Sequence, residues 1–157
     1  MNINAATRAL IRKYEGCRLT AYQCSAKVWT IGWGATRFED GSSVKPGDTI
    51  TQERADKLLV ILLDQFAAQL RPLVRSDIND NQFGALLSFA YNAGIGAFTR
   101  STLRKMSIAN PNNQHIRAEF AKWNKAGGKV SLGLTRRRQA EADIYFTPII
   151  GNNPTNQ

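Results

Sequence analysis

The sequence lacks any long hydrophobic run, which limits how the chain can meet a membrane. No apolar stretch in its 157 residues approaches the roughly 20 residues needed to cross a bilayer. The first residues, up to about position 16, also lack the continuous apolar core of a signal peptide. We therefore expect no stable membrane insertion, and a chain that stays in the cytoplasm until another factor releases it.

Cysteine and histidine are scarce. The two cysteines, Cys17 and Cys24, are too few for a disulfide scaffold. They could pair if a hairpin brings them together, but two free thiols in a reducing cytoplasm are the simpler expectation. The single histidine, His115, has no neighbouring ligands at zinc spacing. We expect neither a metal nor a cofactor.

Acidic residues are outnumbered. The chain has 21 Lys and Arg against 12 Asp and Glu, a net charge of +9. This charge suits a polyanion, either nucleic acid or the acidic polymers of the bacterial envelope, although a solvated basic surface without a specific partner is also common. No basic and aromatic binding motif supports nucleic acid, so we expect no nucleic-acid partner.

The remaining composition is that of an ordinary globular protein, with 43% hydrophobic and 21% charged residues. The chain is long enough for one well-buried domain, or for two small lobes that share a helix. It contains no internal repeat.

The stretch Glu15–Gly34 organises the chain. Ahead of it, apolar residues recur at helical spacing, and Gly16 is expected to end this helix in the left-handed conformation. Alternating apolar residues then predict a β-hairpin. Folded back over the helix end, the hairpin would place Cys24 and Thr30 opposite Glu15.

The rest of the sequence predicts helices separated by polar loops. Pro72 is expected to end the second helix. The sheet tip and its exit loop contain Glu39 and Asp40 as solvated turn residues. The tail after Pro148 should fray. The predicted helices are 51–70 with Thr51 as N-cap, 79–91, a short helix carrying His115, Phe120 and Trp123, and a last one after Leu134; the predicted loops are 37–48, 92–96, 110–113 and 126–134.

Three ordered blocks resemble a known family. The first, EGCRLTAYQCSAKVWTIGWG, resembles the pattern E-G-x-R-L-x-A-Y-x-D-x-x-G-x-x-T-I-G-Y-G of the phage lysozymes (endolysins) of glycoside hydrolase family 24. It departs at Cys24, usually Asp, at Lys27, usually Gly, and at Trp33, usually Tyr. SFAYNAG (88–94) and GLTRRRQAE (133–141) resemble the second and third blocks. The matching positions of the first block are Glu15, Gly16, Arg18, Leu19, Ala21, Tyr22, Thr30, Ile31, Gly32 and Gly34.

The resemblance implies an α+β, lysozyme-like fold for residues 1–157 as a single, monomeric domain. A small sheet-bearing N-terminal lobe (about 15–50) and a larger helical C-terminal lobe (about 70–147) would be joined by the helix at 51–70, with the N-terminal helix in addition. It also implies that the substrate is the glycan chain of peptidoglycan, cut at the β-1,4 bond between N-acetylmuramic acid and N-acetylglucosamine. The host cell would lyse once a holin had permeabilised its membrane.

Glycoside cleavage needs a proton donor and a second group on the other face of the sugar ring. Glu15 is the only carboxylate of the first block and takes the acid role, with Glu39 and Asp40 as the fallback. Cys24 is the second catalytic candidate, as a thiolate that holds or attacks the positive transition state. Thr30 is the third, because its hydroxyl can orient a water.

Substrate-binding candidates come from the second and third blocks. Tyr91 and Ser101 are expected to touch the sugar chain, although packing or helix capping would explain either residue alone. The run 136–138 is either a solvated helix face, partly paired with Glu141, or supplies one inward arginine that pairs with Glu15. We favour the inward arginine and assign it to Arg137.

Other function classes remain open on the sequence alone. The main alternative is a catalytically weak or inactive peptidoglycan-binding protein with the same fold, suggested by Cys24. A nucleic-acid-binding protein is suggested only by charge. A cysteine hydrolase built from Cys24 and His115 is the weakest alternative, since the pair is far apart in sequence and lacks a third partner.

Overall fold

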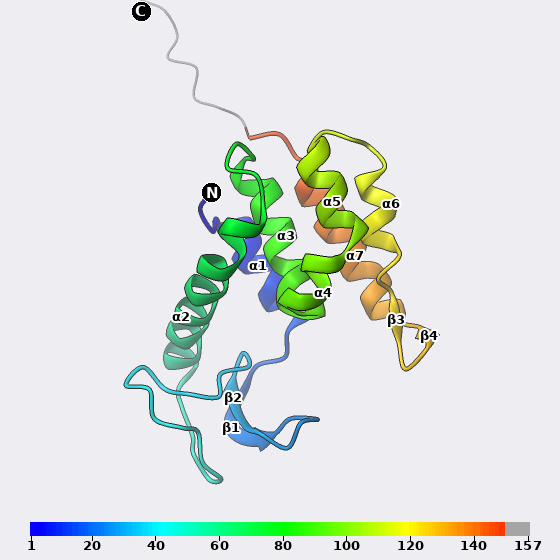
Figure 1. Cartoon of the computed structure of the whole chain (residues 1–157). Coiled ribbons are helices and arrows are strands. Elements are labelled where there is room, and N and C mark those ends of the chain that lie inside the picture. Colours follow the sequence, from blue (N-terminus) through cyan, green and yellow to red (C-terminus); the bar gives the residue numbers. More distant parts are fainter. Residues whose placement is uncertain (150–157) are drawn as a thin grey trace, which may run out of the picture.

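The computed structural model describes residues 1–149, so the tail expected to fray lies outside the described part apart from Ile149. It has the expected α+β class. Figure 1 shows the β1–β2 hairpin at one end of the molecule, helices α3–α7 gathered at the other, and α2 running between them. The elements are α1 (Ala5–Tyr14), β1 (Arg18–Gln23), β2 (Trp29–Gly32), α2 (Gln52–Leu70), a 3₁₀ turn (Arg71–Leu73), α3 (Asp80–Ala93), α4 (Ile95–Arg100), α5 (Thr102–Ala109), α6 (Ile116–Ala121), β3 (Lys125–Ala126), β4 (Lys129–Val130) and α7 (Leu132–Tyr145).

Helix α1 ends differently from our prediction. Its start is capped by Asn4, whose side chain accepts a hydrogen bond from the Thr7 amide at 3.0 Å. At its other end Glu15 leaves the helix in an extended conformation, with φ −93° and ψ 135°. The left-handed stop predicted at Gly16 is wrong, because an extended path leads directly into β1 without reversing the chain.

Two glycines shape the turn that follows the hairpin. Strands β1 and β2 are antiparallel, with Tyr22 opposite Thr30. Gly32 and Gly34 then take φ values of 63° and 116°, which disfavour any residue with a side chain. A Cβ on Gly32 would lie 3.4 Å from the Cβ of Ala55, so this glycine also lets the turn lie close against α2.

Helix α2 connects the parts of the hydrophobic core. Thr51 caps it as predicted, accepting from the Arg54 amide at 3.2 Å. Among the described residues, α2 is the only helix that contributes buried side chains to all three hydrophobic clusters: Leu58 to that of the hairpin, Leu59 and Leu63 to that of α1, and residues 67 and 70 to that of α3–α7.

Helix α3 forms the centre of the helical part. Asn79 and Gln82 make a reciprocal capping box at its start, and residues 81–90 are all buried. The helix continues through Ala93, two residues beyond our predicted end at Tyr91, and breaks at Gly94 with φ 99°.

The segment 126–134, predicted as a loop, contains regular secondary structure, so that prediction is wrong for part of it. Strands β3 and β4 form a short hairpin whose turn residues, Gly127 and Gly128, both have positive φ. Helix α7 then begins at Leu132, and the Ser131 side chain accepts from the Leu134 amide at 3.2 Å.

Gly84 lets α1 and α3 approach each other, and its substitution should destabilise the fold. A Cβ there would lie 1.8 Å from the Oγ1 atom of the buried Thr7. Overpacking costs about 1–3 kcal/mol, more than the gain of at most about 1 kcal/mol from replacing a helical glycine with alanine. We expect Gly84→Ala to lower the free energy of unfolding by about 1–2 kcal/mol in a urea titration.

Gly16→Ala is the matched control, since no atom lies within 4 Å of the added Cβ. It should change the unfolding midpoint little. Equal midpoints for the Gly84→Ala and Gly16→Ala variants would contradict the close approach.

Candidate active site

Glu15 is held by an arginine from the far end of the chain. Its side chain, 25% exposed, accepts a hydrogen bond at Oε1 from a terminal nitrogen of Arg137 at 2.7 Å. Arg137 lies on α7, is 3% exposed, and has its guanidinium carbon 6.0 Å from the centre of the Tyr14 ring. The predicted pairing of an inward arginine with Glu15 is confirmed, and Arg137 is that arginine.

A second arginine is buried as well, which corrects the expectation of only one. Arg138 is 2% exposed; it donates to both carboxylate oxygens of Glu141, at 2.8 and 2.6 Å, to the Trp123 carbonyl at 2.9 Å, and to the Asn92 side chain. Only Arg136 is exposed, so the solvated-face interpretation is wrong for this run.

Glu141 joins the two arginines and was missed as a site residue. It is fully buried and accepts from Arg137 Nε at 3.1 Å and from the Ser88 hydroxyl at 2.8 Å. The formal charges of Glu15, Arg137, Arg138 and Glu141 sum to zero, and Arg137 is shared between the two carboxylates. The R-R-x-x-E spacing on α7 was the available signal, but the same spacing also occurs on solvated helix faces.

Tyr91 connects this network to the hairpin. Its hydroxyl donates to the Trp33 carbonyl at 3.2 Å, in the turn after β2. Burial, followed by the negative charge of Glu15, raises the pKa of Tyr91 to about 12. The hydroxyl therefore stays protonated at neutral pH and remains a hydrogen-bond donor. A Cβ at Gly34 would lie 3.5 Å from the tyrosine oxygen.

Cys24 and Thr30 lie together at the hairpin turn. Hydrogen bonds from the backbone of Val28, then of Ala26, and a further one from the Thr30 hydroxyl lower the pKa of the Cys24 thiol. Thr30 is 4% exposed, and its hydroxyl donates to the Val28 carbonyl at 2.9 Å. That hydroxyl has one proton, so it donates to the carbonyl or to the sulfur at a given moment.

Ser101 is not brought to this group. It is 4% exposed, its hydroxyl donates to the Phe98 carbonyl at 2.7 Å, and it accepts from the Arg104 amide at 3.0 Å as the N-cap of α5. The hydroxyl thus both donates and accepts within the protein, which favours the capping role. Contact of Ser101 with the sugar chain stays a prediction.

The fallback carboxylates are poor proton donors. The hydrogen bond from Arg54 to Glu39, with 3.0 Å between the ion-paired atoms, lowers the pKa of Glu39. Hydrogen bonds from the hydroxyl and amide of Ser42 lower the pKa of Asp40. Both shifts favour the ionised form of these two exposed carboxyl groups.

A comparison with known protein families shows to which family the chain belongs. A family model described as phage lysozyme matches residues 12–141, a range that includes Glu15, the hairpin and Glu141. The chain belongs to the phage lysozyme family. The network on Glu15 and the hairpin with Cys24 and Thr30 thus lie within the part that defines this family.

Individual relatives agree with the family assignment. The chain is 42% identical to the endolysin of Bacillus phage B103 over 94% of its own length and 55% of the relative's. It is 39% identical to the endolysin of Acyrthosiphon pisum secondary endosymbiont phage 1, covering 92% of itself and 98% of the relative. The crystal structure of a P22 lysozyme variant superposes with a TM-score of 0.82 at 35% identity, covering 94% of this chain and 99% of that one.

The chain spans only about half the length of the B103 relative. In the part of the chain that the structure describes, no helix is both long and apolar enough to span a bilayer.

Replacing Glu141 should test the buried network. In the Glu141→Gln variant the guanidinium groups of Arg137 and Arg138 remain buried without their shared counter-charge, which we expect to cost about 3–5 kcal/mol of unfolding free energy. Urea unfolding measures this cost. Asp143→Asn on the same helix is the control, since it breaks the exposed Arg117–Asp143 pair, worth at most about 1 kcal/mol. Similar losses in both variants would show that the network does not stabilise the fold.

Proposed function

We propose that this member of the phage lysozyme family is an endolysin that cuts the β-1,4 bond between N-acetylmuramic acid and N-acetylglucosamine in peptidoglycan. The observation that carries the proposal is the partly exposed Glu15, fixed at Oε1 by the buried Arg137. Among the described residues Oε2 has no hydrogen-bond partner, so it is free to meet a substrate oxygen.

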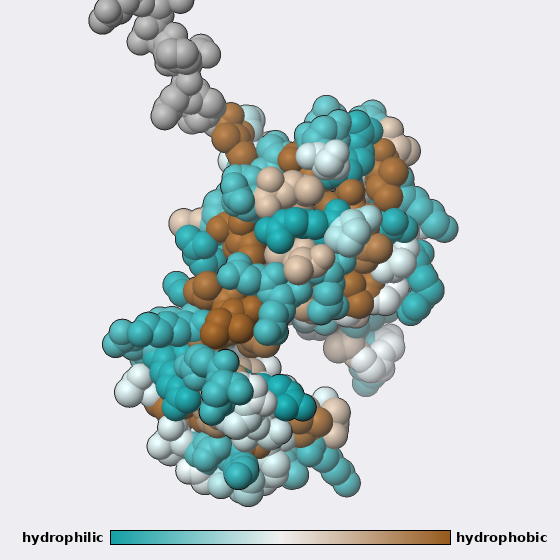
Figure 2. Space-filling view, turned by 60° about the vertical axis from the view of Figure 1, so that its left-hand side comes forward, coloured by the Kyte–Doolittle hydropathy of each residue, from teal (hydrophilic) through white to brown (hydrophobic). Residues whose placement is uncertain are grey.

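The domain arrangement follows from the same proposal. A sheet-bearing lobe of about residues 15–50 and a helical lobe of about 70–147 share the helix at 51–70, and the glycan chain binds between the lobes. Figure 2 supports this view, since the surface is hollowed between its lower and upper parts. Glu15 lies where α1 passes into β1, at the junction of the two parts.

Glu15 acts as the general acid. It protonates the glycosidic oxygen as the bond breaks, while positive charge develops on the sugar ring. Arg137 positions the carboxyl group through Oε1, and its own charge is shared with Glu141. Tyr91, kept protonated by burial, donates to the Trp33 carbonyl and so ties the turn after β2 to α3.

Cys24 and Thr30 provide the second group. The lowered pKa of Cys24 favours a thiolate, which stabilises the cationic transition state or attacks it. When the Thr30 proton goes to the Val28 carbonyl, the hydroxyl oxygen accepts from a water and orients it. The two residues thus supply a negative charge and a water site from one turn.

The inactive wall-binding alternative is less well supported. The relatives named above are endolysins at about 40% identity over more than 90% of this chain. The lowered pKa of the Cys24 thiol supports a role for the thiolate over a purely space-filling one. We further propose a monomer that needs neither metal nor nucleic acid.

Glu15→Gln tests the acid. The amide keeps the size of the side chain but cannot protonate the leaving oxygen, so wall-clearing activity should fall at least about 10²-fold. The variant should remain folded by circular dichroism. Near-normal turnover would move the acid elsewhere and overturn the assignment.

Cys24 variants test the second group in a Cys17→Ser background, where Cys24 is the single thiol. If the thiolate takes part, alkylation should stop turnover and Cys24→Ser should be strongly impaired, while Cys24→Asp should stay active. Because the thiolate forms as pH rises through the thiol pKa, the parent should lose activity on acidification at a higher pH than the Cys24→Asp variant.

The Cys17→Ser protein without further change is the control and should match the original chain. Full activity of both the alkylated protein and the Cys24→Ser variant would show that catalysis does not depend on the thiol. Glu15 and a water held by Thr30 would then suffice.

Release to the wall is proposed to need a separate factor, with the protein held in the host cytoplasm until a holin permeabilises the membrane. Expression of this chain alone should give little lysis, and adding a permeabilising agent should clear the culture. The Glu15→Gln variant controls for damage by the agent itself. Rapid lysis without the agent would contradict this route.

A further inference from the structure

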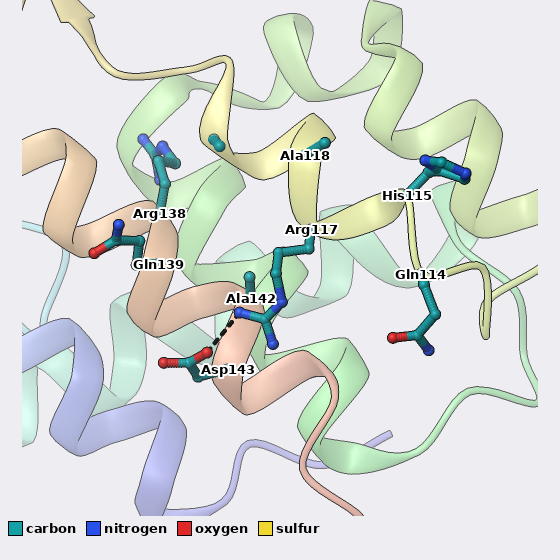
Figure 3. Close-up of a pocket in the computed structure, with 9 residues that line it drawn as sticks. Gln114, His115, Arg117, Ala118, Arg138, Gln139, Ala142 and Asp143 are labelled. Carbon is teal, nitrogen blue, oxygen red and sulfur yellow. Dashed lines mark hydrogen bonds and ion pairs between the residues drawn. The ribbon is translucent and has the colours of Figure 1, made fainter.

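A groove between α6 and α7 lies apart from Glu15, although Arg138 of the buried network lines one edge of it. Its cavity has a volume of about 570 Å³, within the roughly 300–1,000 Å³ of small-ligand clefts. Figure 3 shows side chains from the two helices facing each other across it, with Arg117 bonded to Asp143. Residues that line the groove include Gln114, His115, Arg117, Ala118, Gln139 and Asp143.

The groove and Glu15 lie on different faces of α7. Gln139 and Asp143 line the groove, and each follows by two residues a member of the buried network, Arg137 or Glu141. Two residues correspond to about 200° around a helix. A ligand in the groove would therefore not occupy the place of a glycan chain bound at Glu15.

The charges that line the groove are already paired. Arg117 binds Asp143 at 2.6 Å, and the guanidinium of Arg138 at the groove edge is used by Glu141, Asn92 and the Trp123 carbonyl. Despite the net charge of +9 of the whole chain, the groove does not offer a free arginine to an anion. A neutral, polar ligand fits better.

The remaining polar groups suit a sugar. Among residues 1–149, the side chains of Gln139 and His115 make no hydrogen bonds, and Gln114 uses only its NH₂ group, toward Asn112 at 3.3 Å. Carboxamides and imidazole both donate and accept, as hydroxyl and acetamido groups do. Between these groups Ala118 and other alanines provide a small, apolar floor on which the C–H face of a pyranose can rest.

A second depression lies next to the groove. It has a volume of about 320 Å³, and Gln114 belongs to the lining of both. Its lining adds Asn79, Gln82 and the aromatic Phe146, over which the guanidinium carbon of Arg117 lies 5.5 Å from the ring centre. Two neighbouring depressions with a shared lining residue suit several linked sugars better than one small molecule.

We propose that this groove is a second, non-catalytic binding site for the N-acetylated glycan chain of peptidoglycan. The inference rests on the proposed function, since it assigns a further contact with the same substrate. With few aromatic contacts, affinity for a short oligomer should be weak, with a Kd on the order of 1 mM. On a wall, where many chains lie close together, weak binding at a second site still lengthens the stay of the enzyme.

Binding is tested directly with a short oligomer of N-acetylglucosamine and the Glu15→Gln protein labelled with ¹⁵N. The side-chain amide signals of Gln114 and Gln139 should shift at millimolar oligomer, and Ala118→Leu, which fills the floor, should abolish these shifts. Unchanged amide signals at saturating oligomer would overturn the proposal, whether or not the chain is an active enzyme.

Activity is then compared on intact walls and on short soluble peptidoglycan fragments. Ala118→Leu and the double variant Gln114→Ala/Gln139→Ala should each lose about two- to tenfold on walls, with unchanged rates on soluble fragments. Gln69→Leu and Gln69→Ala, at an exposed position of α2, are the matched controls.

The outcomes separate the two proposals. Failure of the parent protein on both substrates would overturn the proposed function and leave the amide shifts to decide whether the groove binds the glycan. Groove variants with parental rates on walls, or with equal losses on both substrates, would overturn the role of the groove in holding the enzyme on the wall.

Discussion

The buried ion pairs around Glu141 are the constraint on which the site depends. This carboxylate binds α7 to α3 through Ser88 and holds two guanidinium groups from its own helix. Removing one partner from a buried pair is far more costly than breaking an exposed one. Glu141 accepts from Nε of Arg137 and Ser88 accepts from one terminal nitrogen, which leaves the other terminal nitrogen to donate to Glu15. The geometry at the end of α1 is thus set by α7.

The second constraint is α2, which links the sheet to the helices through side chains rather than through the backbone alone. Leu58 packs in the hairpin cluster, and Leu59 packs one residue later in the cluster of α1. The Trp33 indole adds a hydrogen bond to Asp56 of α2 at 2.9 Å, which fixes the glycine turn on the helix. The hairpin is thereby held at a defined place relative to Glu15.

Local signals in the sequence predicted most of the elements, because each signal acts over a few residues. The cap at Thr51 and the hairpin after Glu15 are of this kind. The predictions that failed depended on structure outside the local pattern. Gly16 does not take the left-handed conformation, since the chain runs on into β1, which begins at Arg18. Arg138 is buried because α3 and the loop at Trp123 surround it, which the run of arginines does not reveal.

The departures from the family pattern are informative because two of them share one turn. Lys27 has φ 61°, a left-handed conformation that costs a side-chain-bearing residue about 1–2 kcal/mol and that glycine, the residue of the pattern quoted above, adopts without this cost. The turn also closes Cys24 against Val28, whose carbonyl accepts from the Cys24 amide at 3.0 Å. A backbone turn that presents amides to position 24 stabilises a carboxylate and a thiolate alike, so the same geometry can serve either residue.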